Sequence, residues 1–100
     1  MRFVQIIEFE TERLEEMQQV LEEAGRRNAD RTNGPTHSML LKDRDKPGRY
    51  LALIEFGSYE EAMRNNDDPE TSAMAQRLDA LSTGERVFTN CDLLDARDLK

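Results

Sequence analysis

Apolar residues are most concentrated in the middle of the chain, in a stretch that leads directly into a well-marked helix start. Residues 50–56 (YLALIEF) include six apolar side chains out of seven, which predicts a strand that is covered on both faces. Gly57 ends this run. Ser58 comes next and Glu61 stands three positions later, a capping-box spacing that predicts a helix immediately after the strand.

The amino-terminal part of the chain shows the same order of strand and helix. Residues 2–10 form a β-branched and aromatic run that predicts the first strand. Thr11 is the expected N-cap of an amphipathic helix, because apolar side chains then recur at helical spacing among glutamates and glutamines. Gly25 is a weak point, at which this helix either stops or continues and fades near Asp30; we favour continuation.

Turn-forming residues separate the next two strands. The break at 33–35 (NGP) precedes a run over 36–42 that predicts a second strand. Segment 43–49 carries five charges around a Lys-Pro-Gly sequence and lies between two strand-like runs. We therefore expect it to be a solvent-exposed hairpin loop.

The second helix is interrupted and a last strand follows it. Periodicity breaks at 65–68, where Asp68 before Pro69 predicts a fresh helix start. After a Ser-Thr-Gly turn, residues 86–94 predict the final strand. The polar tail 95–100 is either frayed or in contact with a neighbouring subunit.

The order strand, helix, strand, strand, helix, strand predicts an α+β, ferredoxin-like fold, in which one antiparallel sheet carries both helices on one face. One hundred residues leave room for a single domain, residues 1–100, with a single core. The second face of the sheet then needs cover, because strand 50–56 is apolar on both sides. Two copies packed sheet to sheet would supply it, so we expect a homodimer.

Composition excludes several classes of function. A net charge of −7 without any basic stripe argues against binding nucleic acid. No apolar segment approaches the length of a membrane span, and no basic leader is followed by an apolar run, so we expect a cytoplasmic protein with no membrane partner. Cys91 is the single cysteine, which excludes an internal disulfide, and no metal-ligating constellation is evident.

The central stretch also resembles a known family. The resemblance lies in the run PGRYLALIEFGSYEEAMRNN, preceded by GPTHSMLL and followed by a helix and an outer strand. This pattern resembles the dimeric α+β barrel superfamily of antibiotic-biosynthesis monooxygenase-like domains, over nearly the whole chain. The resemblance implies a homodimer with a ligand cavity between sheet and helices. Members of the family include cofactor-independent monooxygenases, haem-degrading enzymes and small isomerase-like or decarboxylase-like proteins, and many have no known activity.

Two positions depart from the family's commonest pattern, which has Trp near the end of the third strand and His in the following helix. Phe56 stands at or beside the first position, and Asn66, or its neighbour Asn65, at the second. These replacements argue against haem degradation, which leans on an axial His in that helix. An oxygenase acting on an electron-rich aromatic substrate needs mainly an apolar pocket and a few donors, and we expect no cofactor.

His37 is the candidate general base, because it is the one side chain that titrates near neutral pH without help. A hairpin centred on residues 45 and 46 should place it beside Glu55. The simpler alternative for a lone histidine is a structural or surface role.

Asn66 is the candidate hydrogen-bond donor to a developing oxyanion, since it lies about two turns along the second helix. We expect His37, Phe56 and Asn66 to share one region at the mouth of any pocket, with Gln5 as a polar contact for a substrate. The alternative is that the segment around Asn66 serves only as turn chemistry at a helix break.

Two functions remain compatible with the sequence. The favoured one is a dimeric domain that binds a small apolar metabolite without catalysis. The alternative is a cofactor-independent monooxygenase-like enzyme acting on a small aromatic or polyketide-like substrate.

Overall fold

The computed structural model describes residues 1–29 and 34–100, which form one four-stranded sheet and three helices. The elements in chain order are β1 (Phe3–Glu10), α1 (Leu14–Asn28), β2 (His37–Lys42), β3 (Arg49–Phe56), α2 (Tyr59–Asn66), α3 (Pro69–Leu81) and β4 (Val87–Asp92).

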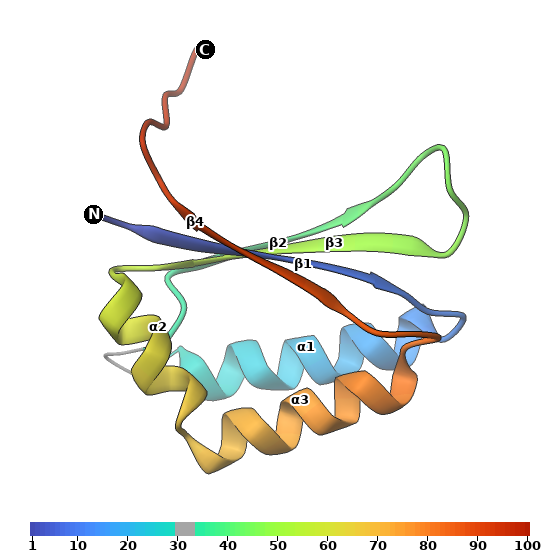
Figure 1. The fold of residues 1–100 in the computed structure, drawn as a ribbon. Helices are drawn as coiled ribbons and strands as arrows, with labels where there is room; N and C mark the ends of the chain where they lie inside the picture. Colours follow the sequence, from blue (N-terminus) through green and yellow to red (C-terminus); the bar gives the residue numbers. More distant parts are fainter. Residues whose placement is uncertain (30–33) are drawn as a thin grey trace.

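The sheet has the strand order β2-β3-β1-β4, and each neighbouring pair is antiparallel. All three helices lie on one side of it (Figure 1). This is the predicted ferredoxin-like arrangement, with the second helix divided in two. The long central strands β1 and β3 pair over eight residues, from Phe3 opposite Phe56 to Glu10 opposite Arg49.

The main core lies between the central strands and helices α1 and α3. Phe9 and Tyr50 stack from opposite positions of β1 and β3, with ring centroids 5.7 Å apart. Met17 on α1 is 1% exposed, and Val20 and Leu78 bury beside it. The apolar face predicted for the first helix is therefore the face that packs on the sheet.

A second, smaller cluster joins α2 to the other end of the sheet. Phe3 and Phe56 pair directly across β1 and β3 and pack on Ala62 of α2. Tyr59 at the start of α2 contacts Phe3 edge to face, at a centroid distance of 5.3 Å. Phe56 is thus a core residue that holds α2 on the sheet.

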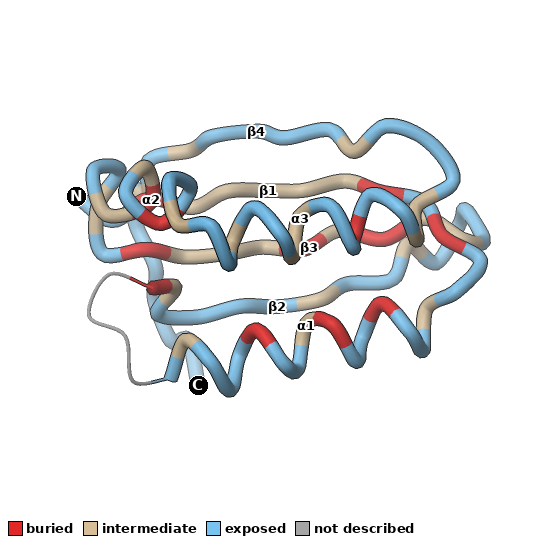
Figure 2. Tube along the Cα trace, turned by 90° about the horizontal axis from the view of Figure 1, so that it is seen from below, coloured by how far each residue is buried: buried red, intermediate tan, exposed pale blue. Residues whose placement is uncertain are grey.

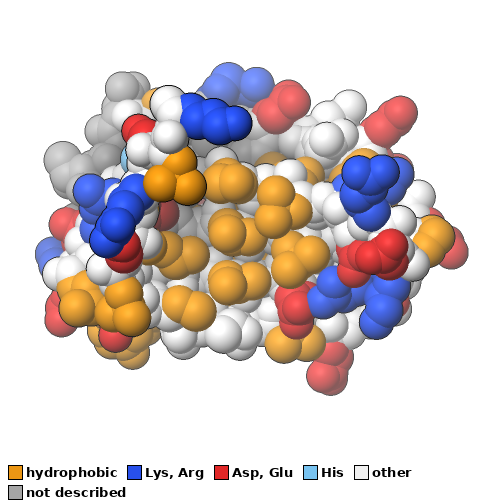
Figure 3. All heavy atoms as spheres, turned by 90° about the horizontal axis from the view of Figure 1, so that it is seen from above, with side chains coloured by type: hydrophobic (Ala, Val, Ile, Leu, Met, Phe, Trp, Pro, Cys, Tyr) orange, Lys and Arg blue, Asp and Glu red, His pale blue; other side chains and the backbone are white. Residues whose placement is uncertain are grey.

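The side of the sheet that carries no helix is called the open face below. Side chains alternate along a strand, so the neighbours of the core residues in β1 and β3 point to this second side. Its centre is apolar (Figure 3), and from the registers its apolar residues are Val4, Ile6, Met39, Leu41, Leu51, Leu53, Val87 and Cys91. Met39 and Val87 on this face are more than half exposed in the single chain.

One junction ties the two long helices to the sheet, and it corrects the predicted role of Thr11. Helix α1 begins at Leu14 after Arg13, without a side-chain cap. The buried Thr11 hydroxyl accepts from the Arg13 N–H at 3.0 Å and also donates to the Leu81 carbonyl at 2.6 Å, at the end of α3. Its backbone N–H bonds to the Gly48 carbonyl in the β2–β3 hairpin at 3.0 Å. Thr11 therefore keeps a local bond at the entry to α1, although the N-cap residue is Arg13, and adds tertiary bonds to α3 and the hairpin.

Most of the other local predictions are confirmed. Helix α1 does continue through Gly25, as far as Asn28. Asp68 caps α3 by accepting from the Glu70 N–H at 2.8 Å, with Pro69 at the first helical position. The 43–49 loop is a hairpin in which Gly48 has φ +84°, a conformation that favours glycine. The predictions that involve Asp30 and Asn33 lie outside the described residues.

The Ser58 cap supplies a test of the fold. Its hydroxyl accepts the Glu61 N–H at 3.1 Å, as the capping-box spacing predicted. Replacing Ser58 by Ala leaves that donor without its partner and is expected to lower the free energy of unfolding by about 1 kcal/mol in urea titrations. Ser72→Ala, an exposed change inside α3, is the matched control and should stay within about 0.5 kcal/mol of the original protein. Equal losses in both variants would contradict the capping role.

Candidate functional site

The helix-facing side of β4 is the part of the sheet that the helices leave uncovered. In Figure 2 β4 runs along one margin of the sheet, with α2 and α3 lying over its neighbours. Phe88 pairs with the core residue Ile7 and therefore faces the helix side, yet it is 50% exposed. An exposed aromatic ring on an inner face is the kind of surface that a small apolar ligand covers.

A hollow of about 520 Å³ lies between the start of β4 and the end of α3, and is lined by Asp79, Gly84, Glu85, Arg86 and Phe88. We call this hollow, together with the adjoining inner surface of β4, the β4 groove. Its volume is within the range of small-molecule sites, roughly 300–1,000 Å³, but the hollow is shallow and largely open to solvent.

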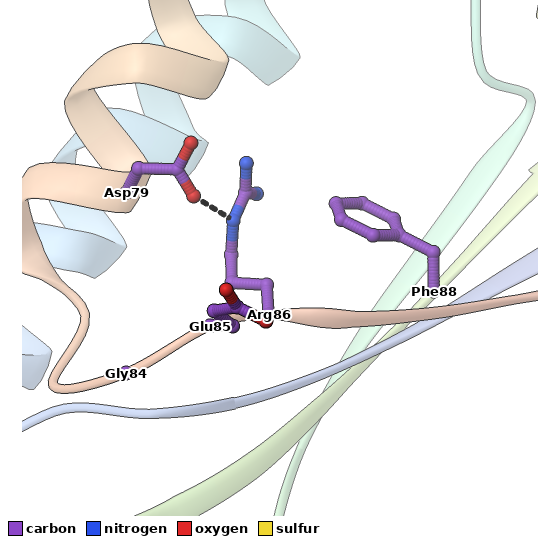
Figure 4. Close-up of a pocket in the computed structure, with 5 residues that line it drawn as sticks. All are labelled: Asp79, Gly84, Glu85, Arg86 and Phe88. Atoms are coloured by element: carbon purple, nitrogen blue, oxygen red, sulfur yellow. Dashed lines mark hydrogen bonds and ion pairs between the residues drawn. The ribbon is translucent and has the colours of Figure 1, made fainter.

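Arg86 forms the wall of the groove that faces Phe88 (Figure 4). Its Nε donates to Asp79 Oδ1 at 2.6 Å, and its Nη2 donates to the Ala75 carbonyl at 3.3 Å. The guanidinium carbon lies 5.1 Å from the centroid of the Phe88 ring, which is a cation–π contact. Helix α3 thus holds the guanidinium over the ring.

Gln5 and Asn90 place a pair of amides on the same inner surface. They face each other across β1 and β4, and Gln5 Nε2 donates to Asn90 Oδ1 at 3.2 Å. Asn90 follows Phe88 by two residues and therefore points to the same side. Gln5, which the sequence suggested as a polar substrate contact, thus lies next to the exposed ring. Its role as a contact stays a prediction.

His37 lies on the opposite side of the sheet, at the edge of the open face. It pairs with Glu55 in the β2–β3 register, as predicted, and its Nδ1 lies 2.7 Å from Glu55 Oε2. Thr36 donates its hydroxyl to the same carboxylate oxygen at 2.8 Å. These two hydrogen bonds, that of Thr36 first and that of His37 second, hold the pKa of Glu55 below its ordinary value.

The structure does not bring His37 and Asn66 together. Glu55 alternates with Phe56, whose ring packs under α2, so Glu55 and His37 point away from the helix that carries Asn66. Asn66 itself is exposed at the end of α2, and its neighbour Asn65 is the buried one. Phe56 is 4% exposed and lies in the core. The expected shared region of these three residues therefore does not form.

Sequence reasoning missed the residues that line the β4 groove. Arg86, Phe88 and Asn90 recur at every second position of the last strand, which places them on one face of it. That alternation was visible in the sequence. The sequence did not show which face of this strand points to the helices, because that depends on the pairing of β4 with β1.

The described residues contain no group of three or more His, Cys, Asp or Glu side chains placed to hold a metal ion. Within the same part of the chain, no helix is long and apolar enough to cross a membrane.

Comparison with solved structures places this architecture. A mutant of SnoaB from Streptomyces nogalater, described as a cofactor-independent oxygenase, superposes with a TM-score of 0.81 at 21% identity, over 95% of both chains. The chain has the fold of the antibiotic biosynthesis monooxygenase-like proteins. A structure named antibiotic biosynthesis monooxygenase matches at a TM-score of 0.73 and 11% identity, over 95% of this chain and 100% of that one.

The same fold occurs in Rv0793 from Mycobacterium tuberculosis, with a TM-score of 0.78, 14% identity and coverage of 98% of this chain and 100% of that one. No protein-family model matches the sequence, and no curated protein matches it either. The resemblance seen in the sequence is confirmed for the fold alone. These identities are too low to carry the chemistry of a site from those proteins to this chain.

The lowered pKa of Glu55 predicts an acid-sensitive contribution to stability. A carboxyl whose pKa is depressed in the folded state stabilises that state above the unfolded pKa, near 4.5, and loses this contribution as the pH falls through the folded pKa. The urea midpoint should therefore drop more between pH 6 and pH 3 in the original protein than in Glu55→Gln. Glu12→Gln, an exposed change beside α1, is the control and should follow the original protein. Parallel acid profiles for the original protein and Glu55→Gln would contradict the assignment.

Proposed function

We propose that this chain is a homodimeric domain that binds a small apolar metabolite in the β4 groove without catalysing its conversion. The half-exposed Phe88, on the inner side of a strand that no helix covers, is the observation that carries the binding part. The Gln5–Asn90 amide pair beside it supplies donors and an acceptor that would orient a ligand. The proposal keeps the cytoplasmic location expected from the sequence.

The dimeric part rests on the open face. The chain exposes 7263 Å². A typical folded monomer of its mass, 11.6 kDa, exposes about 5,800 Å² by the usual scaling of surface with mass. The extended carboxy-terminal tail and the open face both contribute to this excess, since Leu94 and Leu99 in the tail and Met39 and Val87 on the open face are more than half exposed. A second copy packed on this face would bury surface of the size that stable dimers bury, roughly 1,600 Å² in total.

The position of the tail supports the same partner. After Leu93 the chain leaves the sheet and rises on the side of the open face (Figure 1). Leu94 and Leu99 are 86% and 88% exposed. A copy of this chain seated on the open face would lie within reach of both leucines, since an extended tail of this length spans about 20 Å and packed sheets stand about 10 Å apart.

The placement of His37 supports binding rather than catalysis. A general base must lie within hydrogen-bond reach of the proton that it removes. His37 is on the other side of the sheet from the groove, and its Nδ1 is engaged with Glu55. The groove residues named above supply an arginine, a phenyl ring, carboxylates and amides. The amides, which lie beside the ring, carry no charge.

A cofactor-independent oxygenase remains the second candidate, and the similarity to SnoaB favours it. Chemistry of this kind on an electron-rich aromatic substrate would require the groove to hold the ring and stabilise developing negative charge on its oxygen. In this chain Arg86, Asn90 and Gln5 carry donors on the same side of the sheet as Phe88.

Met39→Asp tests the dimer. Met39 is 57% exposed on the open face, so its replacement should leave the monomer folded while placing an unpaired charge in the interface. We expect sedimentation at about 10 μM to show a dimer for the original protein and a monomer for the variant, since buried unpaired charges cost several kcal/mol. Ser38→Asp, one residue away on the other side of β2, is the matched control and should remain dimeric. A monomeric original protein would refute this part of the proposal.

Ligand binding is tested with 1-methylnaphthalene as an apolar probe, followed by the backbone amide signals of ¹⁵N-labelled protein. The largest shifts are expected at Phe88 and Asn90, and Phe88→Ala should weaken binding because the ring supplies the contact surface. Tyr59→Ala is the control, since it removes an exposed ring at the other end of the sheet. Shifts confined to the open face would contradict the site.

Oxygen uptake separates the two candidate functions. With 1-naphthol as an electron-rich substrate, the favoured function predicts no uptake above the protein-free rate. Uptake that Asn90→Ala abolishes would establish the oxygenase instead.

A further inference from the structure

Arg86 has a mostly buried side chain whose unused donors reach solvent, because no buried side-chain nitrogen in the described residues lacks a partner. Its side chain is 8% exposed, far less than the 62% of its partner Asp79. A guanidinium has five N–H donors. Two of them are used, one by the Asp79 carboxylate and one by the Ala75 carbonyl. The remaining three have no protein acceptor within the described part of the chain.

The used donors fix the direction of the free ones. Both acceptors of Arg86 belong to α3, so the helix holds the guanidinium along one edge. Figure 4 shows the guanidinium between Asp79 and the Phe88 ring, with the terminal nitrogens beyond the Nε that Asp79 binds. A group held in this way loses little side-chain entropy when it donates to a ligand.

The charges around the groove decide which acceptor suits these donors. Asp79 neutralises Arg86, and Glu85 adds a further negative charge to the lining. The whole chain has a net charge of −7. An anionic ligand would therefore meet repulsion, whereas an uncharged carbonyl oxygen accepts a hydrogen bond from the guanidinium without that cost.

We propose that Arg86 is the specificity-determining residue of the β4 groove, and that it selects an uncharged aromatic ligand bearing a carbonyl group. The carbonyl oxygen accepts from the free end of the guanidinium while the aromatic body lies on the exposed part of Phe88. The inference rests on the proposed function, because it requires the β4 groove to be a binding site.

Three probes of similar shape test this inference by titration calorimetry: 1-acetonaphthone with a neutral carbonyl, 1-naphthoate with an anionic carboxylate, and 1-methylnaphthalene with no acceptor. We expect 1-acetonaphthone to bind about tenfold more tightly than 1-methylnaphthalene, which is the factor for one hydrogen bond to a charged donor. Arg86→Met should remove this advantage. Arg77→Met is the matched control and should keep it, because Arg77 on the same helix pairs instead with Glu23 on α1.

A second measurement keeps the test valid if Arg86→Met fails to fold. In the original protein, the side-chain N–H signals of Arg86 should move on addition of 1-acetonaphthone and stay in place with 1-methylnaphthalene. Equal affinities for these two probes would overturn the role of Arg86 and leave the groove as a binding site. Tightest binding of 1-naphthoate would overturn the selection of an uncharged ligand. Absence of binding by all three would overturn the proposed function as well.

Discussion

The structure depends on a sheet that is apolar on both faces while its own helices cover only one. On β3 the side chains of Tyr50, Ala52 and Phe56 enter the core, and the alternate residues Leu51 and Leu53 emerge on the other side. Covering one face leaves the other in water, at a cost that grows with its apolar area. The open face follows from this one imbalance. The β4 groove has another origin, because it exists where the helix layer is too narrow for four strands.

Local rules predicted most of the architecture because most of its boundaries are set locally. The capping box at Ser58, the Asp68-Pro69 start of α3 and the glycine turn before β3 each act within a few residues of sequence. The His37–Glu55 neighbourhood followed from hairpin pairing alone. For Thr11 local rules predicted a bond to the start of the helix, and its hydroxyl does accept from the Arg13 N–H; they missed the bond to Leu81, which is 70 residues away.

The site was harder to predict than the fold, since it depends on which of the two alternating sets of side chains in each strand faces the helices. Pairing His37 with Glu55 already excludes a shared face with Phe56, because adjacent residues of a strand point to opposite sides. That exclusion could have been drawn from the sequence. The groove residues Arg86 and Phe88 required more: the edge position of β4 and the limited width of the helix layer are properties of the assembled molecule.

The hydrogen bonds around Thr11 hold one end of the molecule more firmly than the other. At that end, the Leu81 and Gly48 carbonyls and the Glu10–Thr83 backbone bond fasten the hairpin and the start of β4 to the ends of β1 and α3. At the other end, short α2 rests on the sheet through the small cluster of Tyr59, Ala62 and Met63 against Phe3 and Phe56. Spontaneous opening in the native state would therefore begin at α2, and amide protons there would exchange with solvent first. The end anchored by Thr11, which also carries the β4 groove, keeps the strand register intact.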